Sequence, residues 1–145
     1  MTTLLALDPG GTTGYSLWEY TAITPLTLIH KGQISGGLDG FIAWSAGMHP
    51  EEVVAETFRL DGRTVKPDVT PLRIEGALSV IWPHWIGQPN TMKVHADDVF
   101  MKRAGLSFRG MPHATDSARH ALALMKVRRH VPTIKRYWPD RKEEQ

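Results

Sequence analysis

The stretch LLALDPGGTTG, residues 4–14, constrains the fold more than any other part of the chain. A run of apolar residues that is typical of a buried strand ends at Asp8. Proline, two glycines and two threonines follow, and the chain then turns apolar again in YSLW. Small residues favour a tight reversal and allow close approach of another backbone or a phosphate. The pattern therefore predicts two paired strands, with Asp8 held rigidly at the end of the first.

Apolar periodicity and turn residues predict the remaining elements. Strands are expected over residues 3–8, 14–20, 26–34, 53–56 and 91–95. Helices are expected over residues 38–48, 70–82 and 114–128, with a shorter one over 96–104. The short connections between the first three strands predict an antiparallel meander. The order of elements predicts an α/β protein in which helices pack on a central sheet.

Length and composition place the chain among ordinary globular proteins. Its 145 residues fit one domain, and 41% of them are hydrophobic. No apolar run approaches the ~20 residues that span a bilayer, and no secretory signal is recognisable at the N-terminus. The absence of cysteine excludes disulfides, zinc–thiolate sites and thiol nucleophiles. We therefore expect no membrane association and a cytoplasmic location, which would be the host cytoplasm for a viral protein.

Charge is distributed unevenly along the chain. Residues 1–72 hold 4 Lys and Arg against 8 Asp and Glu, whereas residues 73–145 hold 13 against 7. This asymmetry indicates a polyanionic partner, although a solvated C-terminal helix would also explain it. Aromatic side chains interleaved with basic ones can hold phosphates and stack on bases. The C-terminal segment has such a group: Lys135, Arg136, Tyr137 and Trp138.

Two acids end two of the predicted strands. Asp8 follows LLAL and Glu56 follows VVA. Either acid alone would be read as an exposed loop residue. If the strands are neighbours, however, both carboxylates emerge together, and unpaired like charges would be costly. A divalent cation would neutralise them, and hard oxygen ligands suit Mg²⁺ or Mn²⁺.

The last predicted helix, MPHATDSARHALALMK, carries the third polar element. Its apolar stripe has the spacing of one helical face: Ala114, Ala118, Ala121, Leu122 and Met125. His113, Asp116 and His120 share a different face near the helix start. We interpret His120 as an ordinary solvent-exposed side chain. His113 and Asp116 are candidates for the same site as Asp8 and Glu56.

These three segments together resemble the signature of the RuvC family of Holliday-junction resolvases, in the RNase H-like superfamily. The segments are LLALDPGGTTGYSLW, VVAETF and HATDSARHALALM, and the resemblance covers roughly residues 3–128. It implies an RNase H-like fold with a five-stranded mixed sheet, in which three antiparallel strands are followed by two parallel ones and helices cover both faces. Matched position by position, the implied active-site residues are Asp8, Glu56, His113 and Asp116.

The resemblance also implies an activity. The expected enzyme is a Mg²⁺-dependent endonuclease that resolves Holliday junctions and other branched DNA through a two-metal hydrolysis, with Mn²⁺ able to substitute. Two ions about 4 Å apart would activate a water and stabilise the leaving 3′ oxygen. Asp8 would bridge the ions, and Glu56 and Asp116 would complete their shells. His113 could bind or orient the second metal, position the water or shuttle a proton.

Partners follow from the same resemblance. A homodimer is expected, with an apolar face of the second predicted helix as its interface: Leu72, Ile74, Leu78, Ile81 and Trp82. The alternative is that this face covers the sheet. The family's aromatic wedge, which enters the junction, is expected at Phe58, with the neighbouring Arg59 as its possible substitute. The expected phosphate contacts are Lys93, Lys102, Arg103 and Arg109.

Residues 1–130 are expected to form the nuclease domain and residues 131–145 a basic C-terminal tail. A short chain without cysteine fits a phage-encoded resolvase. Three alternatives remain: an RNase H-like nuclease acting on RNA or flaps, a DNA-binding module without catalysis, and a phosphotransferase. The last rests on DPGGTTG, which resembles the phosphate loop of sugar kinases and actin, but a second such loop is absent.

Overall fold

Strand β1 (Thr2–Asp8) lies at the centre of a five-stranded sheet with the order β3-β2-β1-β4-β5. The structure is a computed structural model that describes residues 1–59, 62 and 66–139. Strands β2 (Thr13–Tyr20) and β3 (Thr27–Ile34) continue the sheet from β1 in antiparallel fashion. Strands β4 (Glu52–Glu56) and β5 (Ile86–Gln88) extend it in parallel on the other side. The predicted five-stranded mixed sheet is confirmed.

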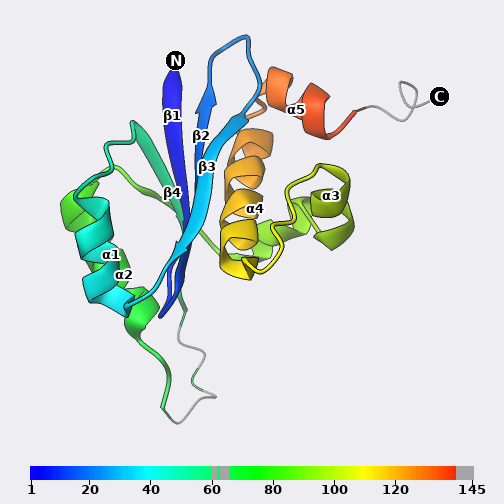
Figure 1. The fold of residues 1–145 in the computed structure, drawn as a ribbon. Coiled ribbons are helices and arrows are strands. Elements are labelled where there is room, and N and C mark those ends of the chain that lie inside the picture. The colour runs from blue at the N-terminus through cyan, green and yellow to red at the C-terminus, as the bar shows by residue number, and fades with distance from the viewer. Residues whose placement is uncertain (60–61, 63–65, 140–145) are drawn as a thin grey trace.

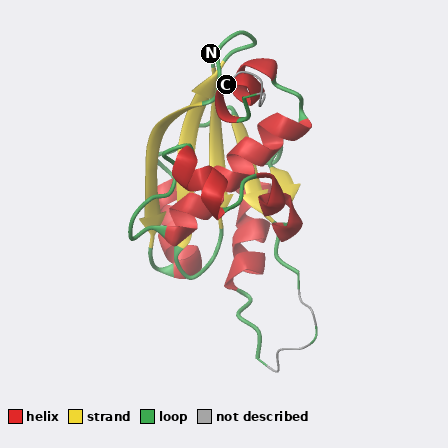
Figure 2. Cartoon of the chain, turned by 90° about the vertical axis from the view of Figure 1, so that its right-hand side faces the viewer, coloured by secondary structure: helices red, strands yellow, loops and turns green. Residues whose placement is uncertain are grey.

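Both faces of the sheet are covered, which explains the unbroken apolar run in β1. Leu5 and Leu7 point to one face, where α1 (Gly37–Ser45) and α2 (Thr70–Ile81) pack. Leu4 and Ala6 point to the other face and contact the long helix α4 (Pro112–Val127). Figure 1 shows these helices on opposite sides of the sheet, and Figure 2 views the molecule from the α4 side. Side chains alternate along a strand, so only a strand buried on both faces is apolar throughout.

Helix α4 packs as its sequence predicts. It begins two residues earlier and ends one residue earlier than expected, with Pro112 in its first turn, where a proline is tolerated. The predicted apolar stripe is fully buried against the sheet: Ala114, Ala118, Ala121, Leu122 and Met125. The small alanines bring the helix backbone close to β1 and β2, so the polar residues of its first turns lie over the strand ends.

The fifth strand was predicted in the wrong place. Residues 91–95 belong to the 3₁₀ helix η1 (Asn90–His95), whereas β5 is the earlier segment Ile86–Gln88. Pro89 separates the two, and proline cannot donate a ladder hydrogen bond. No residue of η1 is buried, and Val94 is 78% exposed. The apparent alternation therefore lacked the buried face that a strand requires.

Two shorter helices complete the α4 side. Helix α3 (Asp98–Arg103) is capped by Asp97, whose Oδ1 accepts a hydrogen bond from the Phe100 N–H at 2.8 Å. Helix α5 (Val131–Tyr137) packs on α4, and its buried Thr133 accepts a hydrogen bond from the N–H of Leu26, just before β3. The boundary expected at residue 130 stays a prediction. Among the described residues, no helix has the length and apolar character to cross a membrane.

Helix α2 uses part of its apolar face within the chain. Ile74 and Leu78 are fully buried, in a cluster with Phe41 of α1. Leu72, Ile81 and Trp82 are half-buried. Of the five side chains predicted for a dimer interface, two therefore lie in the hydrophobic core of the chain itself. The homodimer remains a prediction.

Candidate active site

The carboxyl ends of β1 and β4 place two acids side by side. The parallel pairing of these strands runs as far as Leu7 opposite Ala55, and the next residue on each strand is the acid. Asp8 is buried, with a side chain 10% exposed, and Glu56 is more open. Parallel neighbours bring equivalent ends to one edge of the sheet, so the predicted proximity of Asp8 and Glu56 is confirmed.

The two acids have opposite pKa shifts. Burial raises the pKa of Asp8 to about 8, helped by a hydrogen bond to Glu56 and by its negative charge. Burial also acts to raise the pKa of Glu56, but the neighbouring side chains of His120, Asp8 and Lys93 outweigh it and lower this pKa to about 2. Two adjacent carboxylates do not both ionise without a compensating cation. Asp8 is therefore the acid of the pair that holds a proton more readily, and its hydroxyl can donate a hydrogen bond to Glu56.

His113 meets Asp8 from the first turn of α4. Its Nδ1 lies 3.2 Å from Asp8 Oδ2, and its ring is 47% exposed. An imidazole beside a carboxyl group can accept a proton from it or donate one to it. A positively charged group near Asp8 favours its ionised form. The predicted grouping of His113 with Asp8 is present in the structure.

Two residues that the sequence pattern does not reveal hold the start of α4 in place. Gly14 lies against the backbone of His113: a Cβ atom at Gly14 would come 2.0 Å from the His113 carbonyl carbon. Gln33 of β3 accepts hydrogen bonds on Oε1 from the N–H groups of His113 at 2.9 Å and Ala114 at 3.4 Å. Gln33 thereby satisfies N–H groups that a helix leaves free at its start. The sequence indicates Gly14 only as the first residue of the second predicted strand.

Asp116 lies between two basic side chains. Lys93 Nζ, from η1, is 3.2 Å from Asp116 Oδ2 and 3.0 Å from Glu56 Oε1. Arg119 Nε donates to Asp116 Oδ1 at 3.1 Å, and the same guanidinium contacts Ala96 O and the Asp98 carboxylate. Burial lowers the pKa of Lys93, but the neighbouring acids outweigh it and raise this pKa, so the ammonium stays charged.

The interpretation of His120 as solvent-exposed was wrong. His120 is fully buried, with Nδ1 donating to Gln88 Oε1 at 2.8 Å and Nε2 located 3.7 Å from Glu56 Oε1. In the part of the chain that the structure describes, this Nε2 is a buried nitrogen without a hydrogen-bond partner. The helical spacing correctly places His120 on the same side of α4 as His113 and Asp116. The apolar run ALALM that follows His120 is the sequence signal that indicates its burial.

The donor set suits a hard divalent cation, but the side chains are paired with one another. Asp8, Glu56 and Asp116 supply carboxylate oxygens, and His113 supplies a ring nitrogen. Across residues 1–59, 62 and 66–139, no group of three or more His, Asp or Glu is arranged to hold a metal ion. Lys93 already bridges two of the three carboxylates. Carboxylate oxygens are the donors that Mg²⁺ and Mn²⁺ prefer, and two of the three carboxylates here pair with Lys93.

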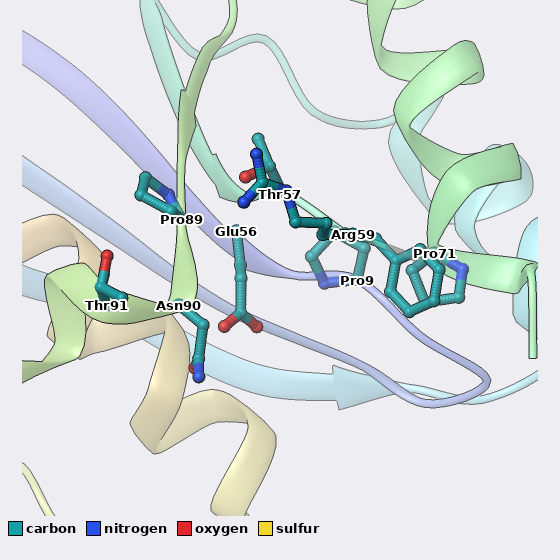
Figure 3. Close-up of a pocket in the computed structure, with 9 residues that line it drawn as sticks. Pro9, Glu56, Thr57, Arg59, Pro71, Pro89, Asn90 and Thr91 are labelled. Carbon is teal, nitrogen blue, oxygen red and sulfur yellow. The ribbon is translucent and has the colours of Figure 1, made fainter. Parts of the chain in front are cut away.

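The residues expected to contact DNA are spread over three surfaces. Phe58 and Arg59 line a cavity of about 740 Å³ beside Glu56 (Figure 3), together with Pro9, Thr57, Pro71, Pro89, Asn90 and Thr91. Arg109 lines a second cavity with Asp116. Arg103 lines a third with Arg136 and Tyr137, apart from the four candidate catalytic residues. Lys102 is exposed on α3.

Comparison with solved structures identifies the architecture. RuvC of Thermus thermophilus, in complex with a Holliday junction substrate, matches 90% of this chain and 97% of its own, with a TM-score of 0.65 and 16% identity. The chain has the RuvC-like fold. The Holliday junction resolvase of fowlpox virus shares this RuvC-like fold, matching 86% of this chain and 99% of its own at a TM-score of 0.61 and 13% identity.

The RuvC-like fold is thus recognised from structure and from short motifs. Neither a protein-family sequence profile nor a curated protein sequence matches the chain. The resemblance drawn from three sequence segments is confirmed at the level of the fold. The phage origin stays a prediction.

Proposed function

We propose that the chain is a metal-dependent, structure-selective endodeoxyribonuclease that resolves Holliday junctions and cuts other branched DNA. One observation carries the proposal: the carboxylates of Asp8, Glu56 and Asp116 and the imidazole of His113 converge on the strand ends of a RuvC-like fold. These side chains come from β1, β4 and α4, which are far apart in the sequence. Proteins of this fold include RuvC bound to a Holliday junction substrate and a viral Holliday junction resolvase.

Each residue of the site has a distinct part in this proposal. Divalent cations at the site would supply a reactive water and positive charge for the leaving 3′ oxygen. Asp8 and Glu56 would hold the ions from two neighbouring strands, and Asp116 would hold them from α4. The half-exposed ring of His113 borders both Asp8 and solvent, so it can orient an attacking water or move a proton at Nε2.

The remaining predicted contacts concern the DNA. Phe58 and Arg59, which line a cavity with Glu56, would meet bases or phosphates next to the cleaved bond. Lys102, Arg103 and Arg109 would bind phosphates further out, so DNA binding should weaken steeply with salt. We propose a homodimer, because two symmetric nicks in a four-way junction require two such sites.

A cleavage assay tests the proposal. Labelled four-way junction, flap, linear duplex and RNA–DNA hybrid are incubated with Mg²⁺ or Mn²⁺ and either the wild type or Asp8→Asn. Paired symmetric nicks in the junction, lost in the variant, are expected, because an amide cannot replace the charged carboxylate at a cation site. The matched control is Asp39→Asn, an acid of α1 outside the site, which should cut like the wild type.

Other outcomes would change the assignment. Equal cutting of flaps and junctions would leave a nuclease of broader selectivity, and cutting of the hybrid alone would indicate an RNA-processing enzyme. Binding of the junction without cleavage by either metal would leave a DNA-binding module, and the catalytic assignment of the four residues would be wrong.

A further inference from the structure

Lys93 inserts a positive charge into the candidate active site. Its ammonium lies 3.0 Å from Glu56 and 3.2 Å from Asp116, and thus joins an acid of β4 to an acid of α4. The side chain is 24% exposed. It comes from η1, a short 3₁₀ helix without a buried residue. A single cationic side chain therefore links two carboxylates from a segment that has no buried residue.

The ammonium lies where a bridging metal ion would have to lie. A divalent ion sits about 2.0–2.2 Å from carboxylate oxygens, which is shorter than the two Lys93 distances. An ion that bridged Glu56 and Asp116 would need the space and the oxygens that Lys93 now uses. Lys93 and a bridging cation therefore exclude each other.

A second, independent observation points to a missing ligand in the same place. His120 is completely buried, and its Nε2 faces Glu56 Oε1 at 3.7 Å without a hydrogen-bond partner in the described part of the chain. Buried polar groups normally have partners. While Lys93 binds Glu56, the Nε2 atom of His120 therefore lacks the hydrogen-bond partner that a buried nitrogen normally has.

We propose that Lys93 is an internal competitor of the divalent cation, which occupies the gap between Glu56 and Asp116 until a metal ion displaces it. This inference rests on the proposed function, because it concerns the cation of the same site. The DNA-free protein then binds the metal weakly. A phosphate that took the displaced ammonium would favour metal binding, which couples DNA binding to metal loading.

Metal binding without DNA tests the competition. Mn²⁺ affinity is measured by titration calorimetry for the wild type, Lys93→Met and, as a matched control, Lys66→Met, an exposed lysine outside the site. Methionine keeps most of the length of the side chain and removes its charge. Lys93→Met should bind Mn²⁺ roughly tenfold more tightly or better, since a competing charge is gone, and Lys66→Met should match the wild type. Equal or weaker binding by Lys93→Met overturns the inference.

Two further measurements separate competition from a purely structural role. The double variant Lys93→Met with Glu56→Gln should lose the gain in affinity, because Glu56 is one of the contested ligands. In EDTA, Lys93→Met should melt below the wild type, because two carboxylates lose their shared ammonium, and Mn²⁺ should close this gap. A gap of the same size in EDTA and in Mn²⁺ would contradict the proposal.

The outcome is distinguishable from that of the cleavage assay. If the wild type cuts no branched DNA but Lys93→Met gains Mn²⁺ affinity, the proposed function is contradicted and the competition between Lys93 and the metal is supported. If the wild type cuts junctions but Lys93→Met gains no Mn²⁺ affinity, the proposed function is supported and the competition is contradicted.

Discussion

The ends of β1 and β4 present the same chemical group in different settings. Glu56, at the end of β4, is met by Lys93 and His120 and is ionised. Asp8, at the end of β1, is more deeply buried and contacts the half-exposed His113, and burial raises its pKa to about 8 despite the nearby charge of Lys93. The position of an acid at a strand end therefore does not set its charge. Its burial and the neighbours supplied by η1 and α4 together set that charge.

The largest expected effect comes from Gly14→Ala. Gly14 belongs to β2 and pairs with Asp8 at the end of β1. The new Cβ would lie 2.0 Å from backbone of His113, which cannot give way as a flexible side chain would. Helix α4 must shift, and His113 moves away from Asp8. We expect a loss of about 2 kcal/mol or more in the free energy of unfolding and at least roughly a hundredfold loss of junction cleavage.

Urea unfolding and single-turnover cleavage measure these effects. Gly76→Ala is the matched control, because a Cβ atom added to this helical glycine would meet nothing within 4 Å. It should be neutral or stabilising by about 0.5–1 kcal/mol. A Gly14→Ala variant that cleaves like Gly76→Ala would mean that the close approach of α4 does not position the site.

The next effect comes from breaking the β4 end with His120→Leu. Leucine fills a similar volume but leaves Gln88 without its 2.8 Å partner and removes the imidazole facing Glu56. An unpaired buried polar group costs about 1–3 kcal/mol, so urea unfolding should show a loss of that size. The exposed His84→Leu serves as control. Unchanged stability of His120→Leu would show that the buried ring contributes nothing to this end.

The comparison is sharpest in the pH dependence of stability. The pKa of Asp8 rises from 3.8 to about 8 on folding, so its contribution is fully present below pH 3.8 and is lost as the pH rises through about 8. The pKa of Glu56 falls from 4.5 to about 2, so its contribution is present above pH 4.5 and is lost as the pH falls through about 2. The two acids should respond to neutralisation in opposite directions.

Thermal unfolding in EDTA measures the difference. At pH 7.5, Asp8→Asn should melt above the wild type by roughly 3 °C, because the amide needs no proton to donate to Glu56. Glu56→Gln should melt below it, because Lys93 loses an ionic partner. The advantage of Asp8→Asn should shrink toward pH 4. Two variants that shift in the same direction at pH 7.5 would contradict the assignment of the proton to Asp8.

The sequence predicts the parts of this site that are set by local pattern. Asp8 and Glu56 end apolar runs, and His113 and Asp116 follow from helical spacing, so their elements could be inferred. The identity of their partners could not. Gln33 contacts the start of α4 although it lies 80 residues earlier in the sequence. Lys93 contacts Glu56 from the segment 91–95, which was predicted as a strand and forms a 3₁₀ helix. His120 lies at the border between the polar and apolar faces of α4, where periodicity alone does not decide burial.

The site and the sheet edge are assembled from opposite ends of the chain, with a consequence for synthesis. Asp8 and His113 are 105 positions apart, and Leu26, beside the edge strand β3, bonds to Thr133 and Tyr137 at separations of 107 and 111. Contacts of such separation form late and slowly. On the ribosome, the first acids emerge long before α4 can lie over them. A nascent chain therefore carries separated acids, and the candidate site can assemble only after α4 has been synthesised.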